Sequence, residues 1–133
     1  MPQLFRVLVP ALAIEAAAVF YERALSVRGK RVSPGRHYFD RDGTILACFD
    51  PEADGERRSA TPNPEAIYIS VVDIEKTDRL AKEAGARLTE GSPPGVGPLG
   101  EIHGRPTGET SFCVIDPFGN EVCFVAEATV FRG

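Results

Sequence analysis

The chain has 133 residues, of which 43% are hydrophobic and 26% are charged. This composition is typical of a soluble globular protein, and the length fits one domain with a fair-sized core. The net charge of −4 provides no basic field, so we expect no nucleic-acid partner. The longest apolar stretch near the N-terminus, residues 7–18, contains Pro10 and Glu15 and is too short to span a bilayer. It also lacks the basic start and the cleavage site of a signal peptide, so we expect no membrane partner.

The three cysteines are widely spaced, at positions 48, 113 and 123, and form no CxxC pair. This spacing indicates neither a disulfide framework nor a zinc knuckle. We therefore expect reduced cysteines and a cytoplasmic location.

The first part of the chain predicts a strand, a helix and three further strands. Residues 4–9 form a short apolar run that Pro10 ends, and residues 11–25 are rich in Ala with apolar residues at helical spacing. The apolar period then falls to two in residues 27–32, 36–40 and 44–49. Asp42-Gly43 is a strong hairpin signal between the last two of these segments.

A polar connector over residues 51–64 precedes a second copy of this pattern. Residues 66–72 predict a strand, residues 73–84 predict a helix that Gly85 stops, and residues 86–90 predict a strand. Residues 91–100 are rich in Pro and Gly and predict a loop, and residues 101–103 fit either a strand or a loop.

Residues 111–125 predict a hairpin, in which two strand-like runs flank the turn sequence Asp-Pro-Phe-Gly-Asn at positions 116–120. Alternation in the second run places Val122 and Phe124 on one face and Glu121, Cys123 and Val125 on the other. We expect the first face to pack against a helix and the second face to line a cavity.

The element order therefore repeats a β-α-β-β-β unit, about residues 3–50 and 65–127, within a single domain over residues 1–133. Each unit has one helix to cover one face of its sheet. We expect an α+β fold in which the two repeats form a curved mixed sheet with the helices outside. Its concave inner face is the expected ligand site.

The repeat and its Asp116–Asn120 turn resemble the vicinal oxygen chelate superfamily, which includes glyoxalase I, bleomycin-resistance proteins, fosfomycin-resistance enzymes and extradiol dioxygenases. Phe20-Tyr21 in the first helix and Asp73 at the start of the second are similar to landmarks of the same superfamily. The resemblance covers nearly the whole chain and implies the fold. It does not imply one activity, because fold does not determine function.

The resemblance also implies where a divalent metal would be held, by His, Glu or Gln, His and Glu on inner strand positions. Counting from the landmarks, these positions hold Arg6, Ala66 beside Glu65, and Cys123, while the fourth falls near residues 46–48, which contain no carboxylate. Since the Arg6 cation would repel a metal, we expect neither the usual metal site nor another cofactor. The superfamily also has members that bind a small molecule without metal.

The residues that we expect to contact a ligand are Arg6, Tyr38, Cys48, Tyr68, Arg105 and Cys123. The fork of an arginine suits carboxylates, and a tyrosine can stack on a ligand ring and donate a hydrogen bond. Cys123 occupies an inner position of the sheet. Each has a structural alternative: an ion pair for Arg6, plain packing for the tyrosines, a small buried apolar residue for the cysteines, and a solvent-exposed pair with Glu109 for Arg105.

Two further hypotheses stand beside a metal-independent small-molecule binding protein. One is a lyase, isomerase or dioxygenase with a noncanonical metal set drawn from Glu65, Asp50 or His103. The other is an interaction module that binds a protein on its sheet. We also expect a homodimer, since the superfamily commonly completes its cup with a second copy and exposed strand edges favour symmetric pairing.

Overall fold

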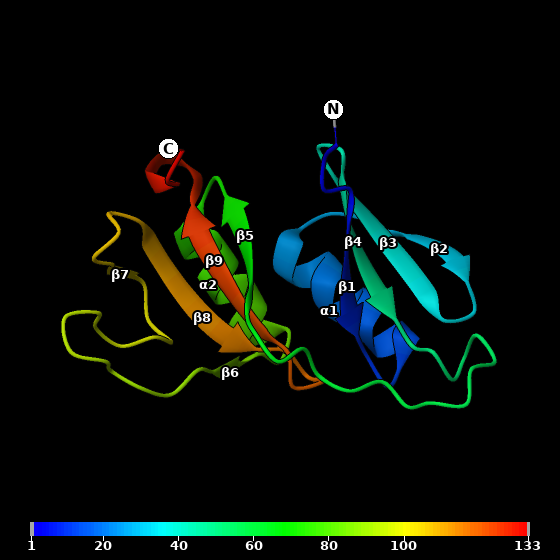
Figure 1. The fold of residues 1–133 in the computed structure, drawn as a ribbon. Coiled ribbons are helices and arrows are strands. Elements are labelled where there is room, and N and C mark those ends of the chain that lie inside the picture. The colour runs from blue at the N-terminus through cyan, green and yellow to red at the C-terminus, as the bar shows by residue number, and fades with distance from the viewer. Residues whose placement is uncertain (1, 133) are drawn as a thin grey trace.

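The structure is a computed structural model, and it describes residues 2–132. The first repeat forms a four-stranded sheet, sheet A, with one helix (Figure 1). Its elements are β1 (Arg6–Pro10), α1 (Ile14–Leu25), β2 (Lys30–Ser33), β3 (Arg36–Arg41) and β4 (Thr44–Phe49). The strand order is β1-β4-β3-β2, with β1 parallel to β4 and the other pairs antiparallel. The predicted order of elements in this half is confirmed.

The second repeat forms sheet B with strand order β5-β9-β8-β6 and with β7 also paired to β8. Its elements are β5 (Ile67–Val71), α2 (Ile74–Glu83), β6 (Arg87–Leu88), β7 (His103–Gly104), β8 (Thr110–Ile115) and β9 (Glu121–Ala126), followed by a 3₁₀ turn, Glu127–Thr129. The strand predicted over residues 86–90 is shorter than expected. Both β6 and β7 pair with the outer edge of β8. They are two short strands rather than one because the Pro- and Gly-rich loop between them does not pair with β8 as a strand.

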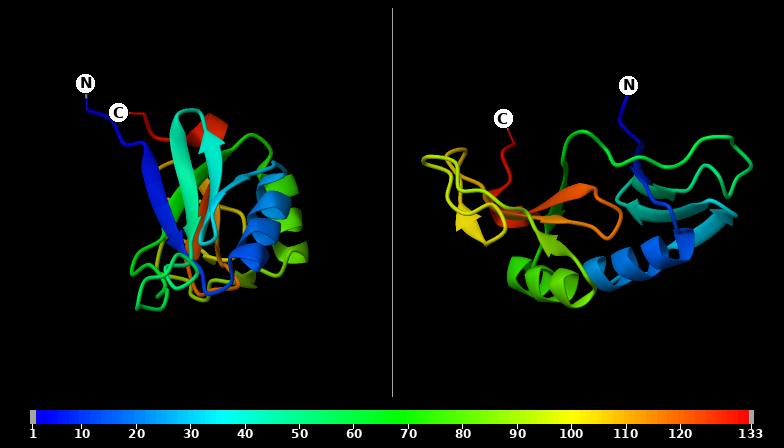
Figure 2. Two further views of the ribbon diagram at one scale, coloured as in Figure 1. Left: turned by 90° about the vertical axis from the view of Figure 1, so that its right-hand side faces the viewer. Right: turned by 90° about the horizontal axis from the view of Figure 1, so that it is seen from below.

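The two helices lie side by side and cover the same side of the curved pair of sheets (Figure 2). The α+β class and the two-repeat architecture are thereby confirmed. The strand surface turned away from α1 and α2 is called the open face below. Within the described residues, no helix is long and apolar enough to cross a membrane.

One core cluster joins the helices to the helix-facing side of both sheets. Helix α1 contributes small and aromatic side chains, of which Tyr21 is fully buried. Val122 and Phe124 of β9 are also fully buried in this cluster, which confirms the face predicted for them by alternation. Burial of one such side chain contributes about 1.5–3 kcal/mol to folding.

A buried hydrogen-bond network centred on Asp116 ties the two repeats together. The Asp116 side chain is fully buried, and its Oδ1 accepts from the backbone N–H groups of Phe118 and Asn120, both at 2.9 Å. Its Oδ2 accepts from the Tyr21 hydroxyl at 2.6 Å and from Asn120 Nδ2 at 3.0 Å. The turn of the second repeat thus binds the helix of the first.

Asn120 extends this network to two more segments. Its Nδ2 donates to the carbonyl of Pro10 at the end of β1, at 2.7 Å, and its Oδ1 accepts from the backbone N–H of Asn63 in the connector, at 2.9 Å. Gly119 adopts a φ of 93° within the turn, a value that glycine tolerates and that other residues rarely adopt. The predicted turn is confirmed, and its polar residues have structural partners.

We predict that Tyr21→Phe lowers the free energy of unfolding by about 1–3 kcal/mol, because it leaves a buried carboxylate oxygen with one donor fewer. Burial, followed by the charge of Asp116, holds the pKa of Tyr21 well above its ordinary value, so the hydroxyl remains a donor at neutral pH. Urea unfolding measures the change. Tyr68→Phe is the matched control, since Tyr68 is 70% exposed, and it should shift stability by less than about 0.5 kcal/mol. Equal effects of the two variants would contradict the role given to Asp116.

Candidate functional site

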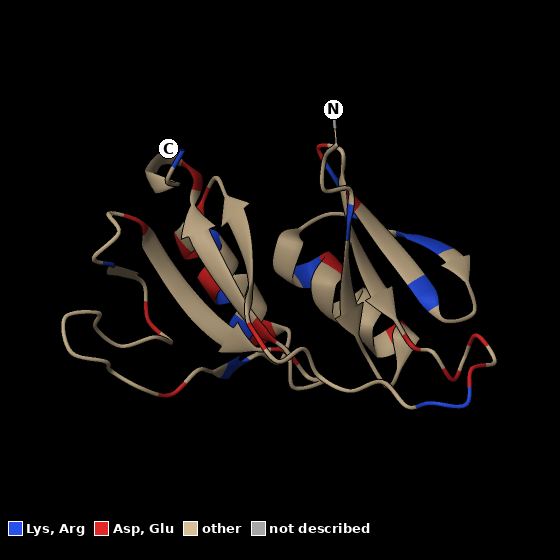
Figure 3. Ribbon diagram, viewed as in Figure 1, with Lys and Arg blue, Asp and Glu red and all other residues tan. Residues whose placement is uncertain are grey.

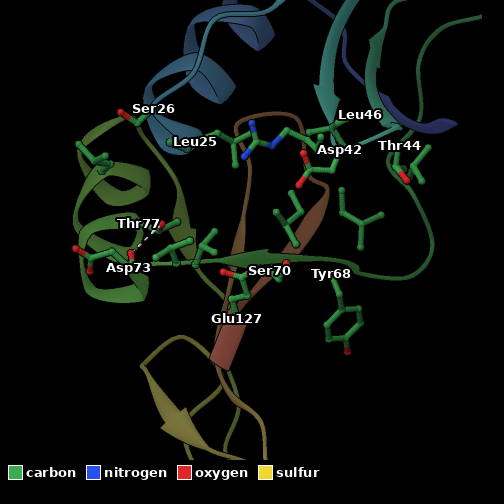
Figure 4. A pocket seen from close by; sticks show the side chains of 18 of the residues that line it. Leu25, Ser26, Asp42, Thr44, Leu46, Tyr68, Ser70, Asp73, Thr77 and Glu127 are labelled. Carbon is green, nitrogen blue, oxygen red and sulfur yellow. Dashed lines mark hydrogen bonds between the residues drawn. The ribbon is translucent and has the colours of Figure 1, made fainter. Parts of the chain in front are cut away.

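The main cleft lies at the seam between the two sheets, where β1 and β5 are the edge strands, and residues of α1, α2 and β4 also line it. Its volume is about 740 Å³, which falls within the range of small-molecule sites. Its walls are largely apolar, and polar residues such as Asp42, Asp73 and Glu127 also line it (Figure 4). Asn63 Nδ2 donates to the Leu8 carbonyl of β1 at 3.0 Å and partly pairs this edge at one end.

The residues of the open face follow from strand register. In sheet A, Leu8 pairs with Ala47, which pairs with Tyr38. In sheet B, Tyr68 pairs with Cys123. Figure 4 shows Tyr68 projecting from β5 on the side opposite to Leu25, Asp42 and Leu46. The predicted inward position of Tyr68 thus corresponds to the open face, where its side chain is largely exposed.

Arg6 and Tyr38, two of the predicted ligand-binding residues, lie together on the open face of sheet A. The Arg6 guanidinium carbon lies 5.3 Å from the centre of the Tyr38 ring and 5.1 Å from that of Phe5. Both distances are typical of cation–π contacts. Arg36 Nη1 donates to the Tyr38 hydroxyl at 2.9 Å and holds that ring in place. Ligand contact by Arg6, Tyr38 and Tyr68 stays a prediction.

Cys123 forms a disulfide with Cys113, so the expectation of reduced cysteines without a disulfide is wrong for this pair. The two residues are register partners on β9 and β8, with Cα atoms 4.0 Å apart. The Cys113 backbone groups bond to Leu99 and Thr89 on the other edge of β8. The cysteines therefore occupy a non-hydrogen-bonded position of the antiparallel ladder, where side chains approach most closely.

The disulfide depends on register, which cysteine spacing alone does not reveal. One signal was present, because Cys113 lies three residues before Asp116 and Cys123 lies three residues after Asn120. Positions equally distant from a hairpin turn face each other across the ladder. The open face of β9 thus carries a disulfide sulfur at the position where the resemblance implies a metal-binding carboxylate.

Cys48, also a predicted ligand-binding residue, lies on the helix-facing side of β4. It is fully buried in the core cluster and is register partner to Val9 and His37. Burial, reinforced by the charge of Asp116, raises the pKa of Cys48 to about 12. The thiol is therefore neutral at ordinary pH and separated from the open face by the sheet, and we do not include it in the site.

Arg105 binds its own loop rather than leaving its side chain free for a ligand. Its guanidinium donates to the carbonyl oxygens of Val96, Pro98, Leu99, Glu101 and Ser111 and to the Ser111 hydroxyl. Burial lowers the pKa of Arg105 from its ordinary value. All three nitrogens thus have backbone or hydroxyl acceptors, so neither a pair with Glu109 nor a free donor is observed. Sequence reasoning missed this role because carbonyl acceptors carry no residue signature.

The residues at the usual metal positions do not fit a divalent ion. Arg6 is a cation, the side chain of Ala66 has no atom that could bind a metal, and Cys123 is bonded to another sulfur. Among residues 2–132, no group of three or more His, Cys, Asp or Glu side chains is arranged to hold a metal. Glu65, Asp50 and His103 accordingly form no such group.

The profile of the Glyoxalase/Bleomycin resistance protein/Dioxygenase superfamily matches residues 3–124. The chain belongs to this superfamily. A comparison with curated protein sequences finds no significant match.

Solved structures of low sequence identity share this superfamily fold. A glyoxalase-related enzyme from Fulvimarina pelagi is 18% identical, with 94% of this chain and 88% of that chain covered and a TM-score of 0.71. A glyoxalase/bleomycin resistance protein from Albidiferax ferrireducens T118 is 16% identical, with 90% and 94% covered and a TM-score of 0.70. Lactoylglutathione lyase from Agrobacterium tumefaciens is 16% identical, with 94% and 93% covered and a TM-score of 0.66.

We predict that the native, oxidised protein has no thiol that reacts with Ellman's reagent at pH 8. Cys48 is buried with a pKa raised to about 12, and Cys113 and Cys123 are joined. Unfolding without reductant should expose one thiol, and unfolding after reduction should expose three. Three thiols in the unfolded, unreduced sample would contradict the disulfide.

We predict that Arg105→Lys loosens the loop over residues 91–101. Lysine keeps the charge but has one nitrogen where arginine has three, so most of the loop carbonyls lose their donor. The free energy of unfolding should fall by about 1–3 kcal/mol, and amide hydrogen exchange should accelerate in this loop. Arg79→Lys on α2, with a 62% exposed side chain, should change neither measurement. Unaltered amide hydrogen exchange in the loop of Arg105→Lys would refute the structural role given to Arg105.

Proposed function

We propose that this superfamily member binds a small organic molecule at the seam cleft and the adjoining open face, without the usual metal. The observation that carries the proposal is the cleft of about 740 Å³ between β1 and β5, with a stacked arginine beside one wall and an exposed tyrosine on the other. Apolar walls with a few polar groups are typical of small-molecule sites. The fold supports binding at this place without identifying the ligand.

The two walls differ in chemistry. The β1 side presents Arg6 held against Tyr38, which provides charge. The β5 side presents Tyr68, whose ring is 70% exposed and belongs to no aromatic pair formed within residues 2–132. An exposed tyrosine offers a large, rigid surface for stacking at low entropic cost. A ligand that extends from the cleft onto the open face would have this ring on one side and the charged group on the other.

We further propose that two copies form a homodimer. Within residues 2–132, strands β1 and β5 each have an edge without a β-strand partner. Apolar side chains next to these edges are exposed, among them Leu4, Leu8 and Val72. Unpaired edges and exposed apolar residues favour association, and twofold pairing is its commonest form. Analytical ultracentrifugation measures the mass of the assembly, and a monomer at high micromolar concentration would refute this part of the proposal.

We predict that a library of small aromatic and aliphatic fragments contains binders that shift the backbone amide resonances of Ile45, Tyr68 and Ser70, which line the cleft. Tyr68→Ala should weaken the binding of aromatic fragments by roughly three- to tenfold, the worth of one aromatic contact. Val19→Ala, on the exposed side of α1, is the control and should leave affinity unchanged.

The same experiment can reject the proposed function. If no fragment of any charge shifts these resonances, or if every shift maps to residues that do not line the cleft, the seam cleft is not a ligand site. If Tyr68→Ala and Val19→Ala behave alike for every aromatic binder, the β5 wall does not contribute to binding.

A further inference from the structure

Basic side chains are concentrated on the strands of sheet A although the chain as a whole is acidic. The strands of sheet A carry Arg6, Lys30, Arg31, Arg36 and Arg41. In sheet B, β5, β8 and β9 carry no lysine or arginine. Figure 3 shows this contrast, with blue segments on the first sheet and largely tan strands in the second. Of these residues, Arg41 lines the seam cleft, and Arg6 is the register partner of Ile45, which also lines it.

Arg6 contacts two aromatic rings. Its guanidinium carbon lies 5.1 Å from the Phe5 ring centre and 5.3 Å from the Tyr38 ring centre. A cation–π contact uses no N–H group of the guanidinium as a conventional hydrogen-bond donor, so these groups remain available to form the fork that matches a carboxylate. Stacking also restricts the side chain before any ligand arrives, which lowers the entropic cost of binding.

Several other arginines near this face already have acceptors. Arg36 lies 3.6 Å from Asp54 and also donates to the Tyr38 hydroxyl, and Arg58 lies 2.8 Å from Glu56. By contrast, the Arg6 guanidinium takes part in none of the side-chain hydrogen bonds or ion pairs formed within residues 2–132. Its positive charge is compensated by rings and solvent.

A chain of stacked groups supports this arginine from the side away from the cleft. Arg36 donates to Tyr38 and lies 4.3 Å from the Phe49 ring centre, and Arg58 of the connector lies 5.6 Å from the same ring. The rings and guanidiniums thus alternate across β1, β3 and β4 to the connector. The position of Tyr38, and with it that of Arg6, is determined by contacts that do not involve a ligand.

We propose that Arg6, which contacts the rings of Phe5 and Tyr38, binds the carboxylate of a small organic monoanion whose apolar part lies in the seam cleft. Ile45, the register partner of Arg6, lines that cleft, so a ligand can contact both. One uncompensated guanidinium matches one carboxylate. Arg36 and Arg58, which lie farther along the same row of rings, are already paired with carboxylates. The inference rests on the proposed function and specifies the class of ligand.

The test compares 2-naphthoate with its neutral analogue 2-naphthamide, two probes of the same shape that differ in charge. Titrations of the wild-type protein are followed by amide shifts at Tyr38 and Ile45 and by calorimetry. The naphthoate should bind roughly tenfold or more tightly than the amide, the expected worth of a charge-assisted pair. This comparison needs no variant and therefore does not depend on whether a substitution folds.

Variants then assign the preference to Arg6. Arg6→Gln should abolish the difference between the two probes, and Arg6→Lys should retain part of it, because lysine keeps the charge without the planar fork. Arg79→Gln removes one positive charge from the exposed surface of α2 and should leave the preference intact. This control separates a local contact from a change in net charge.

Each outcome decides between the two proposals. Equal affinities of naphthoate and naphthamide at the cleft would overturn the anion inference and leave the proposed function standing. A preference that survives Arg6→Gln would also overturn it, since another group would then hold the carboxylate. Absence of any shift at the cleft with either probe overturns the inference, and the same result with the whole fragment library removes the proposed function as well.

Discussion

The buried carboxylate of Asp116 is the constraint on which the arrangement of the two repeats depends. A charge taken out of water destabilises a protein by several kcal/mol unless donors surround it. Here the donors come from the turn itself, from the Tyr21 hydroxyl on α1, and from Asn120, whose amide also bonds to the end of β1 and to the connector. Any movement of one repeat against the other would break one of these bonds. The network therefore sets how far β1 lies from β5, and with it the width of the seam cleft.

Much of the fold was predictable because most elements are short, regular and amphipathic. Strand β5 alternates Ile and Val with Tyr68 and Ser70, so its faces were unambiguous, and the turn at 116–120 located the last hairpin. Strand β4 was different. In Thr-Ile-Leu-Ala-Cys-Phe both alternating sets are largely apolar, and the pattern does not say whether Ala47 or Cys48 faces the helix. The structure places Cys48 in the core. Because side chains alternate between the two faces of a strand, deciding which alternating set faces the helices determines the role of every residue in the strand.

The remaining features of the site depend on contacts that residue type does not encode. Arg105 finds backbone carbonyls presented by the curvature of one particular loop, and any loop sequence offers carbonyls. The Cys113–Cys123 bond requires the register of β8 and β9, and the spacing of the cysteines becomes informative only once the centre of the turn is known. Arg6 was predictable as an inward residue from the landmarks of the superfamily. Its contact with Tyr38 was not, since it depends on the order of β1, β4 and β3 in the sheet.

The position of Arg6 also bears on how a protein of this superfamily can lack the usual metal ligands and still have a surface that binds a ligand. Where the resemblance implies a metal ligand on the first strand, this chain has a guanidinium, and where it implies a carboxylate on the last strand, it has a disulfide sulfur. Both changes remove oxygen or imidazole donors from the open face, yet neither disturbs the core, which is formed by the opposite alternating set of residues. If Arg6 binds a carboxylate, the positive charge that faces the ligand comes from a side chain fixed by two rings. The chemistry of the open face and the packing of the core can then change independently, because the pleat of each strand assigns them to different residues.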